Sequence, residues 1–159
     1  MPILSYKLRK KYRLAERLLE QSKSTLWNEA KHEWKFENVW WFDEYQTCLC
    51  GKYPIREVCE LVNLETGERA YVGNCCVKSF FNIDLQDSIF TSMRKITQDI
   101  NKAVHCRCVK YAFDKGWIDE GDLNFYLSIC HKRKLSFKQK RNKVRINKEI
   151  LNHVYRPNI

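Results

Sequence analysis

Glycine, proline and long apolar runs are scarce in this chain of 159 residues. Its five glycines and three prolines argue against a disordered or low-complexity chain. No apolar run reaches the roughly 18 residues of a membrane-spanning helix. The N-terminal stretch is charged from Lys7 onward and lacks the apolar core of a secretory signal. We therefore expect a soluble protein of the reducing cytoplasm, without a membrane partner.

Catalytic signatures are also absent from the sequence. It has no H-E-x-x-H metalloprotease motif, no Gly-rich phosphate loop and no G-x-S-x-G nucleophile turn. The histidines are scattered along the chain, at positions His32, His105, His131 and His153. We expect a protein that is not an enzyme and has no small-molecule substrate.

Hydrophobic periodicity predicts several helices. Their ranges are 5–22, a short helix after Ser24 or Thr25, another from Cys75, a long helix from Asp84 or Asp87 to about Lys115, a helix capped by Asp119, and a last helix from Ser136 to about Val154. Ser136 and Gln139 form the predicted capping box of the last helix. The apolar side predicted for that helix is narrow and comprises Phe137, Val144, Ile150, Leu151 and Val154.

Three of the eight cysteines lie in the stretch "TCLCGKYPIREVC", residues 47–59. Disulfides rarely persist in a reducing compartment, so metal ligation is the better interpretation of these thiols. Cys48 and Cys50 form a first ligand pair, and Gly51 follows where a tight turn favours a residue without a Cβ. Thiolates bind zinc tetrahedrally, and two such pairs close the coordination shell of a structural site.

The remaining ligands are expected on the first strand of a β-hairpin and directly after its second strand. "EVCELVN" and "ERAYVGN" predict two strands over 57–74, with Gly67 at positive φ in the turn. Cys59 lies on the first strand, and Cys75 and Cys76 lie at the start of the helix after the second. A turn with two ligands, a hairpin and a ligand on the first turn of a helix is the order of a treble-clef zinc module. Four thiolates would leave no open position for catalysis.

"VHCRC" offers a rival donor set, His105, Cys106 and Cys108. On one continuous helix, residues two positions apart point about 200° apart and cannot share an ion. Only a break in the predicted long helix at this point would bring these donors together.

The predicted fold class is α+β, mainly helical, with a small zinc-stapled, treble-clef-like β-hairpin packed on four or five helices. We expect one compact unit built from three segments. These are a basic helical segment (1–32), the zinc-binding hairpin module (33–82), and a helical region with a basic C-terminal helix (83–159).

Aromatic residues crowd the segment just before the cysteines. They are Trp34, Phe36, Trp40, Trp41 and Phe42. Packing at the junction of the helices and the cysteine module is the first interpretation, and a platform for stacking bases is the second. Four acidic residues within 32–45 disfavour the second.

The cysteine segment resembles a known group of proteins. The shared string is C-x-C-G-x-x-P-I…C…N-x-x-(T)-G…V-G-N-x-C-V-x-x-F, present as Cys48, Cys50, Gly51, Pro54, Ile55, Cys59, Asn63, Gly67, Val72, Gly73, Asn74, Cys76, Val77 and Phe80. It resembles small, uncharacterised zinc-finger proteins of bacteriophages and mobile elements, mainly over residues 33–81. The resemblance implies one structural Zn²⁺ and a bacterial host cytoplasm, with Cys76 rather than Cys75 as the ligand.

Positive charge is concentrated at the two ends of the chain. The formal net charge is +10, with +5 over residues 1–31, −4 over residues 32–71 and +9 over residues 131–159. A one-signed basic helix neutralises phosphates and so favours nucleic acid, DNA or RNA, as the partner. The expected phosphate contacts are Lys132, Arg133, Lys134, Lys138, Lys140, Arg141, Lys143, Arg145 and Lys148, with Lys7, Arg9, Lys10, Lys11 and Arg13 from the N-terminal helix.

A protein of the bacterial host is the alternative partner. In that hypothesis the chain modulates or inhibits the host protein, with the aromatic segment 34–42 as the binding hot spot and the basic charges steering encounter.

Overall fold

The computed structural model describes the backbone of residues 6–81 and 83–156, and the side chains of residues 9–81 and 83–156. Contacts divide the chain into two compact units, residues 1–83 with 156–159 (unit 1) and residues 84–155 (unit 2). The first two predicted segments, 1–32 and 33–82, fall in unit 1, and most of the third, 83–159, falls in unit 2.

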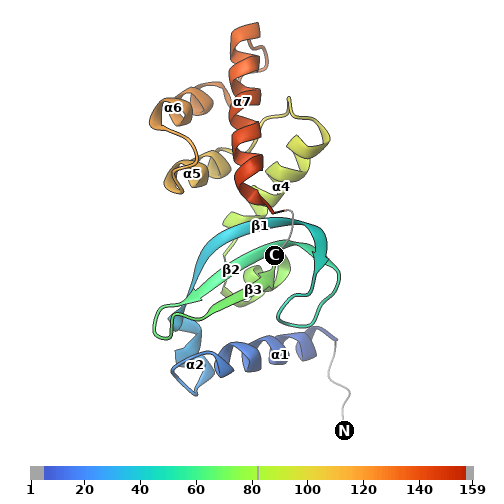
Figure 1. Ribbon diagram of the computed structural model, residues 1–159, viewed down its shortest axis with the longest axis vertical. Helices are drawn as coiled ribbons and strands as arrows, with labels where there is room; N and C mark the ends of the chain where they lie inside the picture. Colours follow the sequence, from blue (N-terminus) through green and yellow to red (C-terminus); the bar gives the residue numbers. More distant parts are fainter. Residues whose placement is uncertain (1–5, 82, 157–159) are drawn as a thin grey trace. The chain divides into compact units, whose positions relative to one another are not determined.

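Unit 1 is built from three short or medium helices, a 3-10 turn and a sheet (Figure 1). Its elements are α1 (Tyr6–Glu20), α2 (Trp27–Ala30), η1 (Lys31–Glu33), β1 (Trp34–Gln46), β2 (Ile55–Asn63), β3 (Arg69–Gly73) and α3 (Asn74–Phe81). The sheet order is β3-β2-β1-β4, and the edge strand β4 (Tyr155–Arg156) comes from the end of the chain. The α+β class and the predicted helix and hairpin of this region are confirmed.

Strand β1 is the main element of unit 1 that the sequence prediction missed. It pairs antiparallel with β2, with Val39 opposite Cys59, and carries the aromatic segment into the sheet. Trp34 and Phe42 are buried at 6% and 1% exposure. Aromatic and β-branched residues favour strands because they fit a pleated, half-buried surface, so the aromatic crowding was itself a strand signal.

The hairpin turn between β2 and β3 is organised by Asn63. Its side-chain oxygen accepts the backbone N–H groups of Glu65 (2.9 Å) and Thr66 (3.0 Å), and its amide donates to Glu33 at 3.0 Å. Gly67 follows at φ 76°, in the left-handed region that glycine tolerates. The Asn and Gly of the shared string therefore have a physical role in closing this turn.

Unit 2 consists of four helices, α4 (Leu85–Gln98), α5 (Cys106–Asp114), α6 (Glu120–Ile129) and α7 (Phe137–Val154). Figure 1 shows α7 between α4 on one side and α5 and α6 on the other. The cap of α6 at Asp119 is confirmed, as is the capping box of Ser136 and Gln139 on α7.

The long helix predicted from Asp84 or Asp87 to Lys115 is wrong, because the chain leaves helical geometry between α4 and α5. Backbone groups of this linker bond to side chains elsewhere in unit 2. The N–H groups of Val104 and His105 donate to Tyr126 Oη and Ser92 Oγ, both at 2.9 Å. Asn147 Nδ2 donates to the carbonyls of Ile100 and Lys102, both at 2.8 Å. These tertiary bonds replace the helical ones.

No helix among the described residues has the length and apolarity needed to cross a membrane.

Candidate metal centre and basic helix face

The loop between β1 and β2 presents two thiols through a tight turn. The Gly51 N–H donates to the Cys48 carbonyl at 2.7 Å, and the Cys48 N–H donates to the Lys52 carbonyl at 2.9 Å. Gly51 has φ 90°, and a Cβ built there would meet Arg13 Nη1 at 2.6 Å. The positive φ therefore favours glycine at this position, as the sequence predicted, whereas the close contact is with the far end of the flexible Arg13 side chain.

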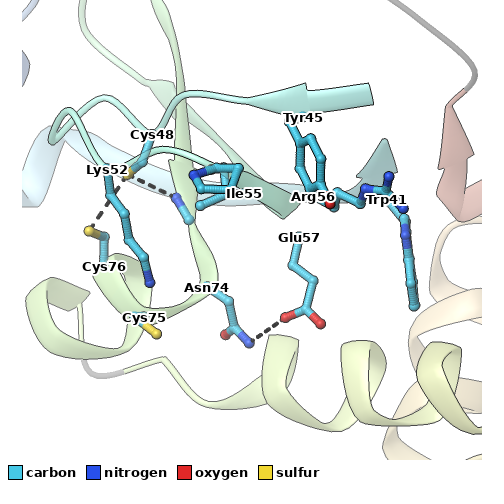
Figure 2. Close-up of a pocket in the computed structure, with 12 residues that line it drawn as sticks. Trp41, Tyr45, Cys48, Lys52, Ile55, Arg56, Glu57, Asn74, Cys75 and Cys76 are labelled. Atoms are coloured by element: carbon cyan, nitrogen blue, oxygen red, sulfur yellow. Dashed lines mark hydrogen bonds between the residues drawn. The ribbon is translucent and has the colours of Figure 1, made fainter. Parts of the chain in front are cut away.

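The third thiol comes from the first turn of α3. The donor atoms of Cys48, Cys50 and Cys76 all lie within 4.8 Å of one another. Figure 2 shows the Cys48 and Cys76 sulfurs facing each other, and they are 3.6 Å apart. Two sulfurs on one tetrahedral zinc ion are separated by about 3.8 Å, given Zn–S bonds of about 2.3 Å. The three sulfurs therefore lie close enough together to bind a single metal ion.

Hydrogen bonds make Cys48 the most acidic thiol of the group. The bond shared with the Cys76 thiol lowers the pKa of Cys48 to about 5, helped by the Gly73 N–H at 3.1 Å, although burial acts in the opposite direction. The same interaction with Cys48 raises the pKa of Cys76, and burial raises that of Cys50. Since a metal ion binds thiolates, it would displace the protons that the other two thiols retain.

Cys59, the predicted fourth ligand, lies outside this group. It sits in the middle of β2 with 0% exposure, between Val39 of β1 and Val72 of β3. The side chain of a mid-strand residue points to one face of the sheet, and Cys59 is not among the thiols whose sulfurs lie within 4.8 Å of one another. Cys75 is exposed and lines the hollow next to Cys48 and Cys76. None of the eight cysteines, all within the described residues, forms a disulfide.

His105, Cys106 and Cys108 do not form a group of three donors, although the helix does break beside them and Cys106 Sγ lies 3.9 Å from His105 Nδ1. His105 is the N-cap of α5, where Nδ1 accepts the Arg107 N–H at 3.1 Å. Cys108 is fully buried, and burial raises its pKa to about 12. In the described part of the chain, the trio of Cys48, Cys50 and Cys76 is the one group of three His, Cys, Asp or Glu side chains close enough to hold an ion.

A hollow of about 370 Å³ opens beside the thiols (Figure 2). Lys52 and Cys75 line it near the sulfurs, and Tyr45 and Arg56 line its other end, where the Arg56 guanidinium lies 4.4 Å from the Tyr45 ring centroid. Asn74 donates to Glu57 at 3.2 Å on its wall. Apart from Cys75 and Asn74, sequence patterns did not single out these side chains, because they converge only when β2 and α3 are placed beside the loop.

The basic residues of α7 gather mainly on its solvent side. The buried residues of this helix are Ile146, Asn147, Ile150 and Val154. At about 100° per residue, an arc of about 100° on the opposite side holds Phe137, Lys138, Arg141, Arg145 and Lys148. We call these five residues the basic face.

The other predicted phosphate contacts are distributed around this face. Lys132, Arg133 and Lys134 are exposed in the segment before α7, and Lys140 is exposed at the margin of the face. Lys143 is only half-exposed, and partial burial lowers its pKa. Arg145 pairs with Asp122 of α6.

The basic residues of α1 belong to unit 1. Arg9, Lys11 and Arg13 are exposed and Lys10 is half-buried. The side chain of Lys7 lies outside the described residues.

No protein-family model, curated protein or solved structure matches the chain.

Proposed function

We propose that this protein is a non-enzymatic, zinc-binding protein that attaches to the phosphate backbone of nucleic acid. The observation that carries the proposal is the combination of one three-thiol centre in unit 1 with a one-signed basic face on α7 in unit 2. The phage or mobile-element setting and the bacterial cytoplasm remain parts of this proposal, drawn from the cysteine string.

The metal would have a structural role in unit 1. Its ligands Cys48 and Cys50 come from the loop after β1, and Cys76 comes from α3, which follows β3 directly. One ion would therefore tie both ends of the β2–β3 hairpin together. Three thiolates leave a fourth position, for which Cys75, which lines the same hollow, is a protein candidate. Soft thiolate donors in a tetrahedral arrangement favour zinc over hard cations.

The basic face would supply the affinity for nucleic acid. In the described part of the chain, no ion pair engages Lys138, Arg141 or Lys148, so their charges are available to a polyanion. Neutralising phosphates releases counterions, which gives affinity that falls steeply with salt. Because the basic face lies within unit 2, we assign this contact to unit 2 alone, and the basic residues of α1, in unit 1, are a secondary surface.

A host protein is the less favoured partner. Its proposed hot spot was the aromatic segment, but Trp34 and Phe42 are buried in the sheet and the Trp40 ring is covered by the Arg156 guanidinium at 3.7 Å. A binding hot spot needs accessible anchors, and this segment offers few.

Fluorescence anisotropy with labelled oligonucleotides over a salt series tests the nucleic-acid proposal. The logarithm of the binding constant should fall linearly with the logarithm of the salt concentration. The double variant Lys138→Gln/Arg141→Gln should weaken binding about tenfold or more and reduce the salt slope by about two. The matched control is Lys95→Gln/Lys110→Gln, which removes two exposed charges from α4 and α5 of the same unit and should retain wild-type binding.

Absence of binding at low salt, or an affinity that does not respond to salt, would contradict the proposal. Equal losses in the two double variants would show that net charge rather than the basic face is responsible. A partner that a tagged chain retains after nuclease treatment would instead favour the host protein.

A further inference from the structure

Phe137 is an exposed aromatic side chain in the middle of the basic surface. Its 78% exposure is the highest of the large hydrophobic side chains that the structure describes. The sequence placed it on the apolar side of the last helix, but it lies about 180° around α7 from the buried Ile146. It is the first residue after the Ser136 cap, so the capping box fixes the backbone from which the ring projects.

The ring stands between two hollows with basic linings. One, of about 1040 Å³, is lined by Phe125, Ser136, Phe137, Lys138, Gln139, Arg141, Asn142 and Arg145. The other, of about 480 Å³, is lined by Asn101, Phe137, Lys140, Arg141, Val144, Arg145 and Lys148. The described residues that line these hollows include no Asp or Glu. A polyanion can therefore pass on either side of the ring without meeting a carboxylate in the lining.

The position of Arg141 links the ring to the charges. Its guanidinium carbon lies 6.0 Å from the Phe137 ring centroid, so one charge and one aromatic face are presented side by side. Surfaces that bind single-stranded nucleic acid combine these two elements, with cations along the backbone and aromatic rings against the bases. In a duplex the base faces are already stacked on one another, and a side chain on a helix surface does not reach them.

We propose that Phe137 stacks on an unpaired base, so that the basic face binds single-stranded nucleic acid in preference to duplex. The phosphates on either side of that base would contact Lys138 and Arg141 in one hollow and Lys148 in the other. Polar groups of Ser136, Gln139 and Asn142 border the first hollow and can hydrogen-bond to a base edge. This inference rests on the proposed nucleic-acid binding and adds its substrate class.

The test compares a labelled dT20 single strand with a labelled 20-base-pair duplex, using the zinc-loaded chain of 159 residues in anisotropy titrations. Phe137→Ala should weaken dT20 binding about tenfold, within the range for loss of one stacked base, and change duplex binding less than about twofold. Phe137→Trp should retain dT20 binding. Phe113→Ala is the matched control, since Phe113 is a partly exposed phenylalanine of α5 that lines neither hollow, and it should change neither affinity.

The outcomes separate this inference from the function on which it rests. If Phe137→Ala binds dT20 like the wild type while Lys138→Gln/Arg141→Gln loses binding, stacking is wrong and phosphate binding stands. Equal weakening of both oligonucleotides by Phe137→Ala also overturns the single-strand preference. If neither oligonucleotide binds the wild type, both proposals fail, and Phe137 becomes a candidate contact for a protein. Because the ring is exposed, the thermal unfolding midpoint of Phe137→Ala should match that of the wild type, which confirms that the variant is folded.

Discussion

Cys48 is the residue on which the candidate metal centre depends most. Its sulfur has the Cys76 thiol on one side and the Gly73 N–H on another, and its carbonyl closes the turn at Gly51. N–H groups directed at a sulfur stabilise the thiolate, which is the form that binds metal. The turn, the end of β3 and the first turn of α3 therefore all meet at this one side chain.

Cysteine variants should separate ligands from packing residues. Native mass spectrometry should find one zinc ion per wild-type chain and none after Cys48→Ser, Cys50→Ser or Cys76→Ser. Those variants should also unfold at lower denaturant concentration, because the energy of metal binding is energy of folding. Cys106→Ser and Cys130→Ser should retain the ion, since their sulfurs lie outside the trio.

Cys59 and Cys75 provide the sharper comparison. Cys59→Ala should retain zinc and lose about 1–2 kcal/mol of stability, as expected for a truncated buried side chain. Cys75→Ser should weaken zinc binding less than Cys76→Ser does. Loss of the ion in Cys59→Ala would instead restore the ligand set predicted from the sequence.

Glu60 is a buried carboxylate whose charge should make stability depend on pH. Burial alone would raise its pKa, but hydrogen bonds from Asn38 (2.9 Å), Trp40 (2.9 Å) and Arg69 (2.6 Å) together lower it. A carboxyl group with a lower pKa in the folded state stabilises the fold above its unfolded pKa of about 4.3, and this contribution disappears as pH falls through the folded pKa.

Glu60→Gln should therefore lower the free energy of unfolding by about 1–3 kcal/mol at neutral pH. The difference from wild type, measured by urea denaturation at several pH values, should shrink as pH falls from about 5 toward 3. Glu68→Gln, an exposed carboxylate next to β3, should change stability by less than about 0.5 kcal/mol. A difference between wild type and Glu60→Gln that does not vary with pH would contradict the role assigned to the Glu60 charge.

Helix α7 has a capping box at its N-terminus and a buried asparagine that hydrogen-bonds to distant parts of unit 2. Ser136 Oγ accepts the Gln139 N–H at 3.2 Å, and Gln139 Oε1 accepts the Ser136 N–H at 3.0 Å. Near its middle, the buried Asn147 side chain bonds to the linker before α5 and accepts the Tyr126 hydroxyl at 2.7 Å. The cap determines where the helix begins, and Asn147 determines which side faces the rest of unit 2.

Removing the cap should destabilise this element by a measurable amount. Ser136→Ala should lower the free energy of unfolding by about 1 kcal/mol, because the Gln139 N–H loses its side-chain acceptor. Hydrogen exchange should rise in the first turn of α7. Since the two bonds form one capping box, Ser136→Ala/Gln139→Ala should destabilise the protein by less than the sum of the single variants. Additive losses would mean that the two side chains act separately.

The candidate metal centre and the basic face belong to different units of the molecule. The thiol trio lies in unit 1, and the basic face lies in unit 2. Metal binding should stabilise the unit that supplies the ligands, because local regions open with their own free energies.

Chelation should therefore affect the units differently. Treatment of the zinc-loaded chain with a chelator should increase amide exchange across residues 47–81, measured by mass spectrometry. Residues 106–154 should exchange at unchanged rates. A uniform increase over both regions would show that the units unfold together.

Local patterns were sufficient for much of the fold. The sequence predicted α1, the hairpin, the cap of α6 and α7 with its capping box, because each depends on contacts between residues close in the chain. It also predicted the turn at Gly51. Of the four ligands predicted from the sequence, Cys48, Cys50 and Cys76 lie together in the structure. Glycine at positive φ and the Cys48–Cys50 pair around a tight turn need no distant partner. Cys76 is different, because it lies on α3, 28 residues after Cys48 in the chain.

The tertiary structure decided the rest. The apolar stripe runs unbroken through Ile96, Ile100 and Val104, yet the helix stops there because Asn147 and Tyr126, far along the chain, bond the linker's backbone. The position of Cys59 depends on how β2 pairs with β1 and β3. The exposure of Phe137 depends on which side of α7 packs against the other helices of unit 2. Such outcomes depend on free energies of long-range packing, which the spacing of residues in a sequence does not contain.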